Sequence, residues 1–202
     1  KRMRASVRIF ANTAAVTEFL PERLAPWMAA HPQIDIELKE RQSSEIARSV
    51  AAGFAEIGIL SSAAEIADLI SHPFAIDRLV AVFALDHDLA KKPQLRFADL
   101  LDHPFIALAD GALQQHLEIQ AAQFGTKLKL RVALRSFESI CRMASEGVGV
   151  GIVPETAARR LRRSARIAMA RLHDGWATRD LSVCVRSEAE LTAPARSLFE
   201  HL

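Results

Sequence analysis

The sequence predicts an α/β fold, and three observations support this prediction. Short apolar runs of strand length alternate with amphipathic stretches of helical period along almost the whole chain. Half of the 202 residues are hydrophobic, which is enough for a substantial core in one domain or in two small lobes. Two segments distant in the sequence also share a helix–glycine–strand pattern. Alternation of this kind favours parallel strands with helices packed on their faces.

The stretch from Val7 to Pro32 organises the rest of the prediction. It begins with a buried strand at Val7–Ala11, and the next residues, Asn12 and Thr13, have side-chain oxygens suited to capping a helix. A proline inside the following helical pattern predicts a kink, or two short helices meeting at Leu20–Pro21. The apolar residues expected on the buried face are Val16, Phe19, Leu20, Leu24, Trp27 and Met28. The strand–helix junction would direct free N–H groups at an anion, although Asn12 could equally serve only as a cap.

The remaining elements are expected in regular succession. The strands are Ile34–Leu38, Ile57–Leu60, Phe74–Ala84, Pro104–Leu108, Leu128–Leu134, Val148–Val153, Ile167–Leu172 and Leu181–Val185. Helices are expected to begin at Ser43, at Phe97, after Asp110–Gly111, at Ser136, at Pro154 and at Leu191. Phe74–Ala84 could be one strand that passes from one lobe into another, and alternation in Leu128–Leu134 predicts one shared apolar face. The helix at Ser43 is expected to bury Ile46, Val50 and Ala51.

The repeated pattern joins two helices to two strands. SEIARSVAAG, residues 44–53, and ESICRMASEG, residues 138–147, share Ile at the third position, Arg at the fifth and a final Gly. Each is followed by a buried strand, and Gly58-Ile59 in the first strand corresponds to Gly151-Ile152 in the second. The similarity either reflects common α/β sequence patterns or indicates two lobes of similar construction, which would offer helix N-termini to a shared cleft.

Composition and charge exclude few partners. The 26 basic and 24 acidic residues leave a net charge of +2. The most concentrated basic run, Arg159–Arg166, is interpreted as the solvated face of a helix, with phosphate binding as the alternative. Cys141 and Cys184 fall in apolar patterns and are expected to be buried, which suits a reducing compartment. We find neither an apolar run of the ~20 residues that a membrane span needs nor a signal peptide.

Enzyme signatures do not stand out in the sequence. The glycines of Gly147–Gly151 have the wrong spacing for a dinucleotide site, and they follow a predicted helix instead of a strand. The scattered histidines lack zinc-ligand spacing, and Asp86–Asp88 is interpreted as a polar turn. We therefore expect no catalytic residues, no metal and no cofactor, although distant residues could still assemble a triad in the folded protein.

Four segments together resemble the effector-binding domain of LysR-type transcriptional regulators. They are VRIFANTAAVTEFLPERLAPWMAAHPQIDIEL, SSEIARSVAAGFAEIGIL, FADLLDHPFIAL and SFESICRMASEGVGVGIVPETA, and the resemblance covers nearly the whole chain. It implies a type II periplasmic-binding-protein-like fold with two Rossmann-like lobes joined by crossover strands. The first lobe would comprise residues 1–77 and 180–202, and the second residues 78–179. A winged helix-turn-helix would precede Lys1.

The resemblance also implies where an effector would bind. The matching positions are Asn12, Thr13, Ser43 and Ser61 in the first lobe and Ala112, Leu113, Ser136 and Phe137 in the second. Many relatives have Ser or Thr where this chain has Asn12, and the turn at 110–113 is poor in donors, so the effector stays open. Hydroxyls and an amide near helix N-termini favour a small carboxylate.

The leading functional interpretation is a cytoplasmic, small-molecule-sensing domain of a LysR-type regulator. Its expected partners are the effector and further copies of itself in a homodimer or higher oligomer, formed through the strand at Ile34–Leu38 and the helix near Trp27. Promoter DNA would be bound only through the preceding N-terminal domain, and no membrane is involved. An extracytoplasmic solute-binding protein of the same fold is the alternative, and an enzyme on this scaffold is a third possibility.

Overall fold

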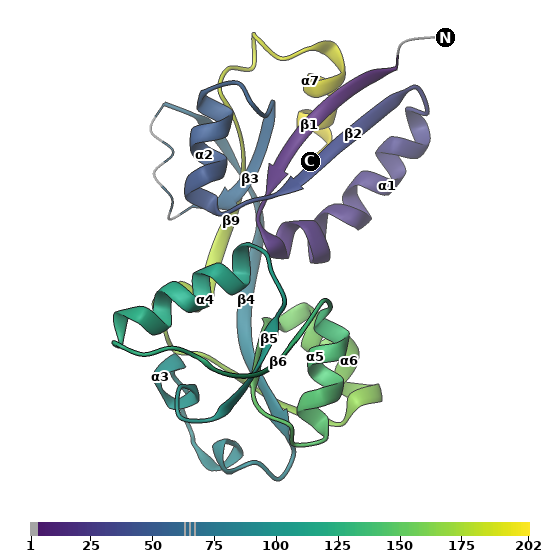
Figure 1. Ribbon diagram of the computed structural model, residues 1–202. Coiled ribbons are helices and arrows are strands. Elements are labelled where there is room, and N and C mark those ends of the chain that lie inside the picture. Colours follow the sequence, from purple (N-terminus) through teal and green to yellow (C-terminus); the bar gives the residue numbers. More distant parts are fainter. Residues whose placement is uncertain (1–3, 63, 65, 67) are drawn as a thin grey trace. The chain divides into compact units, whose positions relative to one another are not determined.

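A computed structural model describes residues 4–62, 64, 66 and 68–202. The chain forms two compact units, one made of Lys1–Ile76 with Arg179–Leu202 and the other of Asp77–Thr178. It passes between them within the long strand β4 (Ile70–Ala84) and again at the start of β9 (Thr178–Val185) (Figure 1). The lobes expected from the sequence differ from these units only in the placement of residues 77 and 179.

Unit 1 is built on a mixed sheet whose strands follow the order β2, β1, β3, β9. Strand β1 (Ala5–Ala11) lies parallel to both β2 (Ile34–Glu40) and β3 (Ile57–Ser61), whereas β9 runs antiparallel to β3. The parallel pairing expected for the first three strands is therefore confirmed. Because β1, β2 and β3 run in the same direction, their carboxyl ends lie at one edge of the sheet.

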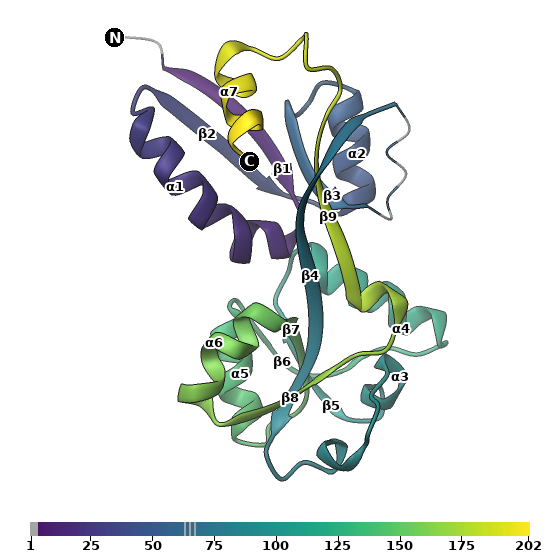
Figure 2. The same cartoon turned by 180° about the vertical axis from the view of Figure 1, so that it is seen from behind.

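Helices cover both faces of this sheet (Figures 1 and 2). On one face, alternate residues of β1 such as Val7 and Ile9 pack with α1 (Leu20–Ala30) and α7 (Ala193–His201). On the other, Phe10 and its neighbours on β3 and β9 pack with α2 (Ser43–Ala51). The period-two alternation of the strands thus divides the core of the unit into two layers.

The first helical segment has two parts, as the proline predicted. A π-helix occupies Ala15–Phe19 and α1 follows, with Pro21 in its first turn. Proline has no N–H and its ring crowds the preceding turn, so a widened turn before it accommodates the ring. The expected burial of Met28 is wrong, because its side chain is 37% exposed, whereas Trp27 is buried.

Helix α2 packs on the sheet through three of its side chains. Ile46, Ala47 and Val50 are buried, but Ala51 is exposed, so its predicted burial is wrong.

The repeated sequence pattern corresponds to a repeated contact. A Cβ added to Gly58 would lie 2.8 Å from Ile46 Cγ2, and one added to Gly151 would lie 2.5 Å from Ile140 Cγ2. In each unit the shared isoleucine therefore packs directly against a strand at a position where only glycine leaves enough room.

Unit 2 contains two groups of paired strands, which share one hydrophobic core with its helices. Strands β5 (Pro104–Leu108) and β6 (Lys129–Leu134) are parallel, and β7 (Gly151–Pro154) and β8 (Ile167–Arg171) run antiparallel to β4. The helices are α3 (Phe97–Leu100), α4 (Ala112–Gln123), α5 (Phe137–Ser145) and α6 (Glu155–Ala165), with short 3₁₀ turns at Asp88–Lys91 and Gly175–Ala177. Apolar residues of these strands and helices form one continuous core.

Two strand predictions in unit 2 are wrong in detail. Leu130 is 53% exposed although the alternation placed it on a buried face, because β6 shifts its register against β5 between Phe105 and Ile106. The strand expected from Val148 begins only at Gly151. Gly149 approaches β5 so closely that an added Cβ would lie 2.5 Å from the carbonyl oxygen of Pro104. This close approach of the two backbones explains the glycine.

Candidate functional site

The carboxyl edge of the unit 1 sheet gathers the first-lobe residues singled out from the sequence. Asn12 follows β1 directly, and its backbone N–H donates to the carbonyl oxygen of Ile59 in β3, 3.1 Å away. Its side-chain Oδ1 accepts from the backbone N–H of Ala15 at 3.0 Å. Asn12 therefore caps the helical segment, as its residue type predicted.

The other end of the Asn12 side chain has unused hydrogen-bonding capacity. Asn12 is only 2% exposed, and its Nδ2 has no hydrogen-bond partner among the described residues. The cap fixes the orientation of the amide, since exchanging the oxygen and nitrogen would set a donor against the N–H of Ala15. A buried donor without an acceptor costs ~1–3 kcal/mol. A ligand that brings an acceptor would remove this cost.

Ser43 and Ser61 are joined at the same edge. Ser43 Oγ accepts from the backbone N–H of Ser61 at 3.0 Å, which ties the first residue of α2 to the last residue of β3. Gln42 stands at the cap position of α2, and the helix begins at Ser43 as expected. Thr13 is also nearly fully buried, and its carbonyl oxygen accepts from the hydroxyl of Thr17. The structure thus brings these residues to one edge of unit 1.

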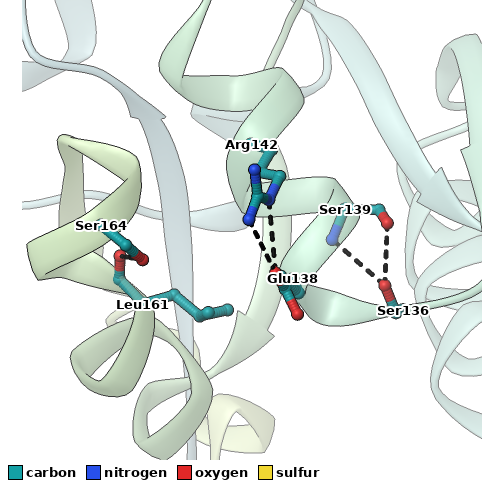
Figure 3. A network of polar contacts seen from close by, with 6 residues as sticks. All are labelled: Ser136, Glu138, Ser139, Arg142, Leu161 and Ser164. Carbon is teal, nitrogen blue, oxygen red and sulfur yellow. Dashed lines mark hydrogen bonds and ion pairs between the residues drawn. The ribbon is translucent and has the colours of Figure 1, made fainter.

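In unit 2 the corresponding positions lie at the N-termini of α4 and α5. These helices follow the parallel strands β5 and β6, whose carboxyl ends are linked by a 2.7 Å hydrogen bond from Ala109 N–H to the carbonyl oxygen of Leu134. Ser136 caps α5: its Oγ accepts from the N–H of Ser139 at 3.1 Å and donates to the Ser139 hydroxyl at 2.9 Å (Figure 3). The helix surface next to this cap carries an exposed Glu138–Arg142 ion pair (Figure 3).

The apolar members of the predicted site are largely packed inside unit 2. Ala112 begins α4 after Gly111, whose φ of 103° lies in the region that favours glycine. Leu113 and Phe137 are 3% and 7% exposed, and both belong to the core of the unit. Their burial gives them a structural role whether or not they also contact a ligand.

One polar residue next to these positions was missed from the sequence. Gln114, the third residue of α4, is 4% exposed. Its Nε2 donates to Glu118 Oε1 at 3.3 Å, and its Oε1 has no hydrogen-bond partner in the described part of the chain. The only available signal was an amide immediately after Ala112 and Leu113 in a helix that also carries other glutamines.

The basic run on α6 is exposed, as interpreted from the sequence. Glu155 is buried, and its Oε1 lies 2.6 Å from Arg159 Nη2 and 3.0 Å from Arg171 Nη2. Hydrogen bonds from Arg171, and then from Arg159, hold the pKa of the Glu155 carboxyl below its usual value despite burial. Part of the basic run is therefore anchored to an internal carboxylate. Arg162, Arg163 and Arg166 are exposed.

The described residues contain no group of three or more His, Cys, Asp or Glu side chains that could hold a metal ion. In the Asp86–Asp88 turn, His87 Nδ1 accepts from the backbone N–H of Leu89. Over the same described residues, no helix has the length and apolar character needed to cross a membrane. Cys141 and Cys184 are free and buried, and burial raises the pKa of their thiols to about 11 and about 12.

Comparison with known proteins extends these observations. A model of the family described as "LysR substrate binding domain" matches residues 1–202. An uncharacterized HTH-type transcriptional regulator of Bacillus subtilis, YwbI, is 25% identical over 91% of this chain and 61% of its own length. The chain spans between about half and two thirds of the length of these curated relatives.

Solved structures agree with the observed fold. The regulatory domain of Synechocystis CcmR in complex with 2-PG has a TM-score of 0.72 and 20% identity, covering 98% of this chain and 95% of that one. The effector-binding domain of BenM with its effector benzoate has a TM-score of 0.66 and 19% identity, covering 98% and 90%. The mixed α/β, type II periplasmic-binding-protein-like fold expected from the sequence is confirmed.

Proposed function

Since this chain belongs to the LysR substrate-binding domain family, we propose that it is the part of a transcriptional regulator that binds a small-molecule effector. We further propose effector-contacting residues at the strand–helix junctions of each unit. These are Asn12, Thr13, Ser43 and Ser61 in unit 1 and Ala112, Leu113, Ser136 and Phe137 in unit 2.

The observation that carries the proposal is the Nδ2 donor of Asn12, which has no hydrogen-bond partner among the residues that the structure describes. This donor is buried at the carboxyl edge of a parallel sheet, where small ligands bind in open α/β folds. The positive end of the following helical segment lies at the same junction, because Asn12 caps it. Both features favour an acceptor with negative charge. A small carboxylate meets both requirements, and benzoate, the effector of BenM, is a carboxylate.

We also infer a role for the rest of the protein. Curated relatives are longer transcriptional regulators, so we assign promoter binding to a DNA-binding domain outside these 202 residues and expect the protein to work in the cytoplasm. The alternative of an extracytoplasmic solute-binding protein is less favoured, because the matching relatives are regulators. These relatives also argue against an enzyme.

Homodimerisation is part of the same proposal. Strand β2 stands first in the strand order of the unit 1 sheet, so its outer edge can pair or pack with a second copy. Met28 on α1 adds an exposed apolar side chain close in sequence to this strand. Sedimentation at tens of micromolar should show a dimer, and a strictly monomeric chain would contradict this part of the proposal.

A ligand screen tests the proposed function directly. Thermal melts of the purified chain should rise with small carboxylates and stay unchanged with matched amides, in which the negative charge is removed. A ligand at a hundred times its Kd stabilises the folded state by about 2.7 kcal/mol, which is several degrees for a chain of this size. Stabilisation by the amides as strongly as by the acids would argue against an anionic effector.

A further inference from the structure

Helix α6 of unit 2 carries a dense positive charge on its solvent side. The stretch from Thr156 to His173 contains six arginines and no Asp, Glu or Lys. Positions 159, 162 and 163 fall within an arc of about 100° around the helix, and position 166 follows as its C-cap. The buried alanines of α6 lie on the other side of the helix. Four exposed residues form this arginine face: Arg159, Arg162, Arg163 and Arg166.

Neighbouring carboxylates neutralise only part of this charge. Glu155 is the one acidic residue of α6, and it is paired with Arg159. Helix α5 packs against α6, and its Glu138 is already paired with Arg142 at 3.0 Å (Figure 3). Three members of the arginine face have no ion-pair partner among the described residues: Arg162, Arg163 and Arg166.

Stability of the helix does not explain the arginine face. Cations in the last turn of a helix interact favourably with its dipole, but like charges crowded on one face also repel one another. Arg166 has a φ of 47°, in the left-handed region that glycine usually occupies at a helix end. Helix termination alone would therefore favour another residue at this position. An anion from outside the chain would reduce the repulsion.

We propose that the arginine face contacts the phosphate backbone of duplex DNA. The guanidinium group is always charged and can donate two parallel hydrogen bonds to one phosphate. The helix rises about 10 Å between positions 159 and 166, and duplex DNA carries one charge per about 1.7 Å of its axis, so several phosphates can lie opposite the arginines.

This inference rests on the proposed function, in which the chain is part of a transcriptional regulator. It adds a second contact to the one that we assign to the DNA-binding domain outside these 202 residues. Contacts with phosphates position a protein on DNA but do not read the base sequence, so sequence recognition stays with that other domain.

An acidic segment of another protein would fit the same guanidinium groups, because carboxylates also accept two hydrogen bonds from arginine. We favour DNA because the curated relatives are transcriptional regulators, and promoter DNA is the polyanion on which such proteins act. An acidic polypeptide is therefore the competing outcome of the test.

Fluorescence anisotropy of a short labelled duplex of random sequence, titrated with the 202-residue chain, tests the inference. The double variant Arg162→Gln/Arg163→Gln removes two charges from the arginine face. The control variant Arg48→Gln/Arg78→Gln removes two exposed arginines from other elements, so both variants have the same net charge. Melts of the ligand-free proteins should confirm that both variants are folded.

The unchanged chain should bind the duplex at about 20 mM salt, and the logarithm of its association constant should fall against the logarithm of the salt concentration with a slope of about −3, for three arginines without a partner. Arg162→Gln/Arg163→Gln should weaken binding at least about fivefold and reduce the slope to about −1, whereas the control should stay within about twofold of the unchanged chain.

Equal weakening in the two variants would mean that net charge alone attracts DNA, and it would overturn the inference. Failure of the unchanged chain to bind the duplex would also overturn it. Polyglutamate that displaces the labelled duplex as well as unlabelled DNA does, at equal charge concentration, would overturn the choice of DNA in favour of an acidic polypeptide.

Melts of the same proteins with small carboxylates test the proposed function separately. Arg162→Gln/Arg163→Gln should keep the full rise in melting temperature that a carboxylate produces in the unchanged chain. Stabilisation by carboxylates without DNA binding would overturn only the inference about the arginine face. DNA binding without stabilisation by any carboxylate would support the arginine face and count against the proposed effector-binding function.

Discussion

Replacing Ser43 by alanine separates two roles that the structure gives this side chain. Ser43 Oγ is the acceptor for the backbone N–H of Ser61, so the change removes the hydrogen bond that joins α2 to β3. The expected loss of unfolding free energy is ~1 kcal/mol, the net contribution of a typical hydrogen bond. For a chain of this size, that loss lowers the melting temperature by about 2–4 °C.

The same variant should also weaken effector binding if the Ser43 hydroxyl donates its proton to an anionic ligand. A hydrogen bond to a charged acceptor contributes ~1.5–3 kcal/mol, so affinity should fall about ten- to a hundredfold. Ser44→Ala is the matched control, since Ser44 is the next residue of α2 and is exposed. Melts and calorimetry on both variants give the two quantities. A lower melting temperature with unchanged affinity would remove Ser43 from the site and leave it as a support for Ser61.

Three further predictions concern the scaffold. Glu155→Gln should cost ~1–3 kcal/mol of unfolding free energy at pH 7, reduced by solvent screening at Arg159 and Arg171. Because the folded-state pKa of Glu155 is lowered, the stability that its carboxylate contributes should be present above the unfolded pKa of about 4.3 and be lost as the pH falls through the folded value. Thermal melts of the unchanged chain and of Glu155→Gln should therefore converge in acid. Gly58→Ala should destabilise the chain by ~1–3 kcal/mol in urea unfolding, since the new Cβ would lie 2.8 Å from both Ile46 and Val50. Gly175→Ala is the control and should change stability little, because a Cβ added there would meet no other part of the described chain within 4 Å. Equal effects of the two variants would refute the packing argument. Thiol alkylation of the folded chain at pH 8 should be slow at both cysteines and become fast on unfolding, because burial raises the two thiol pKa values to about 11 and about 12.

Local patterns in the sequence were sufficient for most of the fold. Strand–helix alternation predicted the parallel strands β1 to β3, the residue type of Asn12 predicted the helix cap that it forms, and a helix does begin after Ser136. The errors arose where a contact distant in sequence overrides the local pattern. Leu130 is exposed because β6 shifts register against β5, and nothing in the alternation of Leu128–Leu134 records that shift.

The candidate site was less accessible to sequence reasoning. Residue type indicated that Asn12 could cap a helix, but only the structure shows which of its amide atoms is used and which is not. The hydrogen bond from Ser61 to Ser43 joins residues that are 18 positions apart, so no local pattern predicts it. Gln114 was missed because a glutamine in an amphipathic helix is expected to face solvent, whereas this one is buried.

We propose that the buried Nδ2 of Asn12 donates a hydrogen bond to an anionic effector, and the Asn12→Asp variant removes this donor. Aspartate keeps the oxygen that caps Ala15 N–H but replaces the donor by a second, negatively charged acceptor. Gln33→Glu makes the same change of charge at an exposed position of unit 1 and serves as control.

Calorimetric titration of the three proteins with one carboxylate from the screen is the decisive measurement, with melts to confirm that each variant is folded. The loss of a hydrogen bond to a charged acceptor predicts binding weakened at least about tenfold in Asn12→Asp and unchanged in Gln33→Glu. A folded Asn12→Asp protein that binds the carboxylate as tightly as the unchanged chain would contradict the claim.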